Sequence, residues 1–221
     1  MKKELSPKSL KLAIFDWSGT ISDDRQIVYE VNNNIRKRVG IPIVPFEEWL
    51  PTTMVNLVEF LQSEGFDYPE EEIKELYEEE LALAKKKGLM PRVYPDAIET
   101  FKYLVGQGFK ITVLSAHPTT HLRSEAKIYG LAPFISLFVG NSTNKSKDLK
   151  IMTQRLGVTT GKEAIFGGDT IFDIRAAKEN DVLSAAFCSG YHTRERLAAE
   201  NPDLIFNQLA DMRSWLEVRH S

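Results

Sequence analysis

The chain has 221 residues, of which 43% are hydrophobic, enough for one substantial domain or for a core domain with one insertion. Its 28 basic and 31 acidic residues give a formal charge of −3, so it lacks the dense positive charge of a general nucleic-acid binder. The basic residues are also scattered along the chain. Nucleic acid is therefore not expected as a partner.

Membrane insertion and secretion are not expected either. No run approaches about 18 uncharged apolar residues, the length that a transmembrane helix needs. The apolar stretch near the N-terminus is interrupted by Asp16 and is too short for a signal peptide. Cys188 is the only cysteine, so it cannot form an intramolecular disulfide and is expected to be a small core residue. A cytoplasmic protein is predicted.

The first predicted elements are one strand and a series of helices. Residues 11–16 form a short apolar run that ends in an acid, which is typical of a buried strand. Residues 25–39, 53–64 and 69–87 carry helical patterns, and no strand signal interrupts them. The last of these helices is rich in glutamate and lysine runs, which we interpret as a solvated face.

From Tyr94 onward, predicted strands alternate with helices. The strand patterns cover residues 109–115, 135–140, 163–169, 182–188 and 204–207, and the helical patterns cover residues 96–105, 119–129, 146–156 and 171–180. This alternation predicts an α/β fold with a Rossmann-like, doubly wound parallel sheet. We expect residues 1–21 and 91–221 to form this core and residues 22–90 to form a helical domain inserted into it.

Polar side chains stand at the ends of three predicted strands: Asp16, Ser115 and Asp169. Sites in parallel sheets form at these carboxyl ends. Asp173 follows on the first turn of the next helix, and a lysine at position 145 or 147 precedes the third strand. Carboxylates, a hydroxyl and a cation in this arrangement suit a divalent cation such as Mg²⁺ and a phosphoryl group.

Four segments in this order resemble the haloacid dehalogenase superfamily of hydrolases, most of which are Mg²⁺-dependent phosphatases. These segments are FDWSGT (15–20), VLS (113–115), Lys145 and GGDTIFD (167–173). The helical insert after the first strand is similar to the cap domain of one subgroup, which includes phosphoglycolate phosphatases and phosphonatases. The resemblance implies a hydrolase of a small phosphorylated metabolite that is a monomer or homodimer.

The resemblance also implies roles for individual residues. Asp16 would be the nucleophile and would form an aspartyl-phosphate. The Mg²⁺ ligands would be Asp16, the backbone carbonyl of Ser18, Asp169 and Asp173. The phosphate would be bound by Ser18, Gly19, Ser115, Ala116 and Lys145. Lys145 fits the family's lysine better than Lys147 because of its spacing to Leu156-Gly157.

Ser18 departs from the family's pattern. Phosphatases of this family usually carry an aspartate here as general acid and base, a role typically worth about 10²–10⁴ in rate. Asp23, Asp24 and His117 are candidate replacements. The departure leaves open a second reading, in which the protein binds a phosphorylated ligand and turns it over weakly or not at all.

Two other branches of the superfamily also have a small residue at this position. Phosphonoacetaldehyde hydrolases need a cap lysine that forms a Schiff base, and this insert has no lysine between Ile41 and Glu64, where that lysine is expected. Lys37 and Lys74 remain, without special context. Haloacid dehalogenases proper do not need Mg²⁺, whereas GGDTIFD is typical of a metal site. Carbon–phosphorus hydrolysis remains an alternative.

Two further features carry no assigned role. Trp17 follows the predicted nucleophile and either gates the site or packs in the core. His192, Arg194 and Arg196 follow a predicted strand and are expected to be surface residues.

Overall fold

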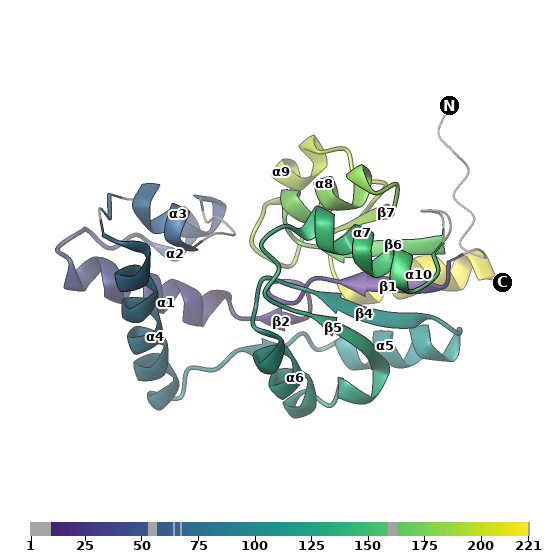
Figure 1. Ribbon diagram of the computed structural model, residues 1–221, viewed down its shortest axis with the longest axis horizontal. Coiled ribbons are helices and arrows are strands. Elements are labelled where there is room, and N and C mark those ends of the chain that lie inside the picture. The colour runs from purple at the N-terminus through teal and green to yellow at the C-terminus, as the bar shows by residue number, and fades with distance from the viewer. Residues whose placement is uncertain (1–9, 53–56, 64, 67, 159–162, 221) are drawn as a thin grey trace. The chain divides into compact units, whose positions relative to one another are not determined.

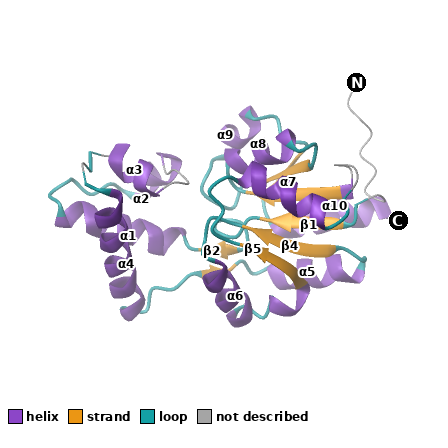
Figure 2. Cartoon of the chain, in the orientation of Figure 1, coloured by secondary structure: helices purple, strands orange, loops and turns teal. Residues whose placement is uncertain are grey.

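Six strands form one parallel sheet in the computed structural model, which describes residues 10–52, 57–63, 65–66, 68–158 and 163–220 (Figures 1 and 2). The strand order is β5-β4-β1-β6-β7-β8, and every neighbouring pair is parallel. The strands are β1 (Leu12–Phe15), β4 (Lys110–Leu114), β5 (Ile135–Val139), β6 (Ala164–Gly168), β7 (Leu183–Phe187) and β8 (Leu204–Phe206). The predicted α/β fold is confirmed. After β1 the chain adds β4 and β5 on one side of that strand, and then β6, β7 and β8 on its other side, so the strand order reverses between β1 and β6.

Helices cover both faces of this sheet, which explains why its strands are apolar on both sides. Ala13 and Phe15 of β1 pack in a cluster with α5, α6 and α10, whereas Leu12 and Ile14 pack on the opposite face with α7 and α8. These helices are α5 (Ala97–Gly106), α6 (Thr119–Ile128), α7 (Lys145–Arg155), α8 (Ile171–Glu179) and α10 (Leu209–His220). The short helix α9 (Arg194–Ala199) lies between β7 and β8 along the chain.

The chain divides into two compact units. One comprises Met1–Asp23 and Val93–Ser221, and the other comprises Asp24–Arg92. The two-residue strands β2 (Ser22–Asp23) and β3 (Arg92–Val93) pair with each other where the chain passes between the units.

The second unit is helical. Its elements are α1 (Arg25–Arg38), α2 (Phe46–Trp49), the 3₁₀ turn Leu50–Thr52, α3 (Leu57–Ser63) and α4 (Glu70–Lys86). One expectation for α4 is wrong. Glu80 does not lie on a solvated face but is 6% exposed, and it pairs with Arg38 of α1 at 3.1 Å. Two-helix packing thus buries one carboxylate of an otherwise exposed glutamate run.

Several elements differ from the predictions. The predicted helix over 53–64 corresponds to α3, and its first residues, 53–56, lie outside the described part of the chain. The strands β2 and β3 were not predicted, because two residues are too few to show a periodic pattern. Helix α10 was also not predicted, although Leu209, Met212 and Leu216 recur at helical spacing and are buried. Within the described ranges, no helix has the length and apolarity needed to cross a membrane.

Candidate active site

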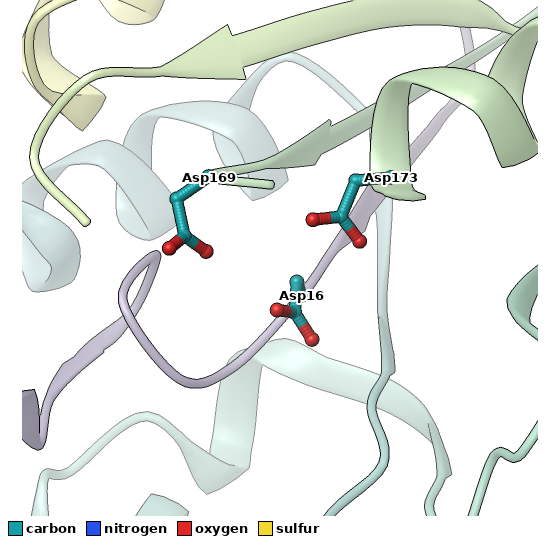
Figure 3. A group of neighbouring side chains, drawn as sticks. All are labelled: Asp16, Asp169 and Asp173. Atoms are coloured by element: carbon teal, nitrogen blue, oxygen red, sulfur yellow. The ribbon is translucent and has the colours of Figure 1, made fainter. Parts of the chain in front are cut away.

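Three buried carboxylates meet at the carboxyl ends of β1 and β6. Asp16 directly follows β1 and Asp169 directly follows β6, and the two strands are neighbours in the sheet. The Asp16 N–H donates to the Gly167 carbonyl at 2.9 Å, which extends the pairing to the end of the strand. Asp173 comes from the first turn of α8. One oxygen from each carboxylate lies within 4.8 Å of the others. Figure 3 shows the three side chains next to one another.

Lys145 lies against two of these carboxylates. It is the first residue of α7, and its Nζ is 3.0 Å from Asp16 Oδ1 and 2.7 Å from Asp173 Oδ1. Its side chain is only 9% exposed. Lys147 is exposed, and its backbone N–H donates to the Asn144 side chain that caps α7. The structure thus brings Lys145 to the carboxylates.

Neighbouring donors hold the other two carboxylates in place. Asp169 accepts hydrogen bonds from the Thr20 hydroxyl and the Tyr191 N–H, each at 2.8 Å. Asp173 accepts from the Thr170 hydroxyl at 2.6 Å and from the Thr170 N–H at 3.1 Å, as the N3 residue of a capping box. Each carboxylate therefore has a fixed orientation before any ligand binds.

Two glycines let the backbone approach Asp169 closely. Gly19 has φ of +73°, and a Cβ at this position would lie 2.2 Å from Asp169 Oδ2. A Cβ on Gly190 would lie 2.1 Å from the same oxygen. Side chains at either position would displace the carboxylate.

The carboxylates are short of compensating charge. Burial raises the pKa of Asp16 to about 6; Lys145 opposes this shift, and the charge of Asp173 adds to it. Burial, and then the charges of Asp16 and Asp173, raise the pKa of Asp169 well above its usual value. Burial also disfavours the Lys145 ammonium, but Asp16 and Asp173 outweigh it and raise its pKa.

This set of donors fits a divalent cation. Three carboxylates and one ammonium leave negative charge in a buried place, and buried charge is costly unless it is paired. All the clustered ligand atoms are oxygens, which Mg²⁺ prefers over nitrogen and sulfur ligands. Asp16, Asp169 and Asp173 are therefore suitable Mg²⁺ ligands.

The predicted phosphate-binding residues lie on two loops. Ser115 follows β4, is buried and accepts a hydrogen bond from the His117 N–H at 3.3 Å. Ala116 is exposed. Ser18 and Gly19 belong to the loop after β1, where Ser18 forms an isolated bridge with Ser22. Because β4 and β1 are neighbouring parallel strands, both loops lie at the same edge of the sheet.

The candidate replacements for the general acid and base come from two segments of the chain. Asp23 belongs to β2, and Asp24 is buried at the start of α1, in the helical unit. His117 lies in the loop after β4, where its carbonyl accepts the Asn141 N–H at 2.8 Å. None of these three belongs to the group formed by the described carboxylates that could hold a metal.

The expectation that His192 is a surface residue is wrong. It is 2% exposed, its N–H donates to the Asp169 carbonyl at 3.3 Å, and its Nδ1 accepts from the Ile171 N–H at 3.1 Å. These two hydrogen bonds hold the loop that carries Asp169 in place. Arg194 is exposed, in agreement with the expectation, and donates to the Asn207 side chain at 3.0 Å.

Three residues that contact Asp169 were not predicted from the sequence: Thr20, Tyr191 and His192. Thr20 belongs to the FDWSGT segment at the end of the first strand, so its hydroxyl could have been recognised as a possible hydrogen-bond donor to a carboxylate of the site. The other two contacts involve backbone atoms of the loop after β7, which leave no trace in the side-chain pattern. Cys188 is half-buried beside Ile174 and Leu197, which only partly fits the expected core position.

Buried acids and a lysine lie at the switch point of a doubly wound sheet, where α/β enzymes form their sites, and the clustered carboxylates are compatible with a metal ion. A family model described as haloacid dehalogenase-like hydrolase matches residues 10–181. The chain therefore belongs to the haloacid dehalogenase-like hydrolase family and is an enzyme of that class, as the resemblance predicted.

Similar proteins are known from several bacteria. A phosphoglycolate phosphatase from Mannheimia succiniciproducens is 26% identical over 218 residues, covering 91% of this chain and 96% of that protein. A phosphoglycolate phosphatase from Salmonella typhi is 25% identical over 164 residues, covering 70% of this chain and 64% of that protein. Both of these relatives are named as phosphatases.

Solved structures share the fold. A predicted phosphoglycolate phosphatase from Haemophilus somnus has a TM-score of 0.78 at 23% identity, over 94% of this chain and 98% of that one. A haloacid dehalogenase-like family hydrolase from Streptococcus pneumoniae has a TM-score of 0.80 at 19% identity, over 94% of this chain and 99% of that one.

Proposed function

We propose that the protein is a Mg²⁺-dependent phosphatase that hydrolyses a small phosphorylated metabolite through an aspartyl-phosphate on Asp16. The observation that carries the proposal is the position of Lys145 Nζ, 3.0 Å from Asp16 Oδ1 and 2.7 Å from Asp173 Oδ1, beside the third carboxylate of Asp169. The names of the relatives make 2-phosphoglycolate the first substrate to test.

In this mechanism, a carboxylate oxygen of Asp16 attacks the phosphorus atom, and the bond from phosphorus to the substrate oxygen breaks. The leaving oxygen takes a proton from solvent water and departs as the alcohol, and a water molecule then attacks the phosphorus of the aspartyl-phosphate, which gives inorganic phosphate and the free carboxylate. Lys145 lowers the repulsion between the attacking carboxylate and the anionic phosphate. At pH 7 Asp16 is largely ionised, because its pKa of about 6 lies below that pH.

The Mg²⁺ ligands in this proposal are Asp16, the Ser18 carbonyl, Asp169 and Asp173. Bound Mg²⁺ would neutralise the phosphate charge and so supply Lewis-acid assistance. Ser115 and the backbone of Gly19 and Ala116 would bind the phosphate oxygens. Residues 24–92 would act as the cap domain that selects the substrate.

Ser18 supports a second candidate, a phospho-ligand sensor with little turnover. A serine hydroxyl at its ordinary pKa is a poor general acid or base, and a positioned acid or base is worth about 10²–10⁴ in rate. Tight binding of a phosphorylated ligand in the presence of Mg²⁺, without release of phosphate, would establish this candidate.

Carbon–phosphorus hydrolysis receives little support from the helical unit. A Schiff-base lysine needs a lowered pKa. Lys74 is exposed, and its hydrogen bond and ion pair with Glu70 raise its pKa. Lys37 is also exposed. Trapping of a lysine adduct by borohydride in the presence of phosphonoacetaldehyde would support carbon–phosphorus hydrolysis.

The proposal is tested by phosphate release from a panel of phosphorylated metabolites, including 2-phosphoglycolate and p-nitrophenyl phosphate. We expect turnover with Mg²⁺ and none with EDTA. Release that is equally fast in EDTA would contradict the metal requirement. No release from any substrate would favour the sensor.

Mg²⁺ should also stabilise the protein, because it would offset the charge of the buried carboxylates. A concentration 100-fold above Kd contributes about 2.7 kcal/mol, which corresponds to a rise in melting temperature of about 5–10 °C for a chain of this size. Asp169→Asn should lose most of this rise. The matched control is Asp181→Asn at an exposed position. An equal rise in wild type and Asp169→Asn would contradict the assignment of Asp169 as a ligand.

A further inference from the structure

The backbone of Trp17 joins the Asp16 carboxylate to the loop that follows it. The Trp17 N–H donates a hydrogen bond to the Asp16 carboxylate. The Trp17 carbonyl accepts from the N–H groups of Thr20 at 3.3 Å, Ile21 at 2.8 Å and Ser22 at 2.9 Å. Any displacement of Trp17 would therefore move both the carboxylate and the loop that carries the Ser18 carbonyl.

The side chain of Trp17 is anchored to α6. The indole is 1% exposed, and its Nε1–H donates to Glu125 Oε2 at 2.6 Å. The ring stacks on Tyr129, with centroids 6.0 Å apart and an interplanar angle of 11°. The Tyr129 hydroxyl is 2.9 Å from Ser22 Oγ, at the far end of the same loop. The loop is thus held at both ends by residues from α6 and its C-terminal cap.

A tryptophan that only fills the core does not require a carboxylate at its indole nitrogen. A hydrogen bond to a charged acceptor is stronger than one between neutral groups. It fixes the rotation of the ring, whereas stacking alone permits sliding. Errors of about 1 Å in the placement of reacting groups can lower a rate by about 10²-fold.

We propose that Glu125 is a positioning residue for Asp16 and that Glu125 acts through the Trp17 indole. This inference rests on the proposed function, in which Asp16 attacks phosphorus and helps to bind Mg²⁺. Glu125 lies on α6, is not one of the three clustered carboxylates, and acts by holding the loop after β1 in one place.

The test compares Glu125→Leu, which removes the acceptor, with Glu125→Gln, which keeps an oxygen acceptor. We expect Glu125→Leu to lower kcat about 10-fold and to weaken Mg²⁺ binding about 10-fold by calorimetry, with KM changed less than about threefold. Glu125→Gln should stay within about threefold of wild type in kcat and in the Kd for Mg²⁺. The control is Glu179→Leu at the exposed end of α8.

A merely structural role would lower the melting temperature of Glu125→Leu but leave kcat and the Kd for Mg²⁺ unchanged below that temperature, which would overturn the proposal. A second test uses Trp17→Phe, which lacks the indole N–H. In this background, adding Glu125→Leu should lower kcat no further, and a full additional loss would also overturn the proposal.

The same measurements separate this inference from the proposed function. If wild type turns over and Asp16→Asn does not, unchanged kcat and Mg²⁺ affinity in Glu125→Leu overturn only the positioning role. If wild type turns over no substrate, the proposed function fails. The calorimetric Kd for Mg²⁺ then still decides the positioning role, because it does not depend on turnover.

Discussion

Asp16→Asn should reduce phosphate release by at least about 10³-fold, because an amide cannot act as the attacking nucleophile. The fold should remain intact. Burial raises the pKa of Asp16, so the neutral side chain removes an unfavourable buried charge, and Lys145 keeps its contact with Asp173. The measurement is kcat/KM at pH 7 on the best substrate of the panel, together with the melting temperature.

Asp181→Asn is the matched control for this variant. It makes the same chemical change at an exposed position with φ of +55°, which asparagine tolerates well. Its activity should equal that of wild type. If Asp16→Asn kept more than about a tenth of the activity, the assignment of Asp16 as nucleophile would be wrong, since losses at nucleophiles are far larger.

Lys145→Met should be the most destabilising of the proposed substitutions. It removes the cation that lies between Asp16 and Asp173, and breaking a buried ion pair from one side typically costs about 3–5 kcal/mol. Urea denaturation without Mg²⁺ measures this loss. Saturating Mg²⁺ should restore part of the stability, whereas activity should stay at least about 10²-fold below wild type.

The pH dependence of this variant has a defined sign. In wild type the pKa of Asp16 is about 6, above the 3.8 of an ordinary aspartate, and removal of the Lys145 cation raises it further, so the native state binds the proton more readily than the unfolded state. Stability is therefore lost as pH rises through this raised pKa and is recovered as pH falls. Without Lys145, part of the stability lost at pH 8 should return at pH 6.

Lys147→Met provides the control for Lys145→Met. Lys147 is exposed, and only its backbone N–H serves the cap of α7, so its substitution should change stability by less than about 0.5 kcal/mol. Equal losses in both variants would show that the carboxylates do not depend on Lys145.

The strands and the strand-end residues could be predicted because they follow local patterns. The strands of the sheet are short apolar runs buried on both faces, and Asp16 and Asp169 stand directly after two of them. Their proximity follows from the parallel pairing of β1 with β6. The resemblance to the family added the preference for Lys145 over Lys147.

The contacts that depend on tertiary structure could not be predicted. His192 is polar and follows a turn, which is typical of a surface residue, yet the loop after β7 folds back onto Asp169 and buries it. Glu80 belongs to a glutamate run, but only the packing of α4 against α1 selects it for burial beside Arg38. The partner of the Trp17 indole likewise comes from a helix far along the chain.

The parallel sheet also determines when the active site can form during synthesis. The hydrogen bond between Thr20 and Asp169 spans 149 residues, and β4 and β5 precede β6 along the chain. In a nascent chain Asp16 is synthesised first, and Asp169 and Asp173 emerge from the ribosome much later. Such distant contacts form slowly, because loop closure must come first. The three carboxylates therefore come together only once the core is nearly complete, so a divalent cation that needed all three could not assist the early steps of folding.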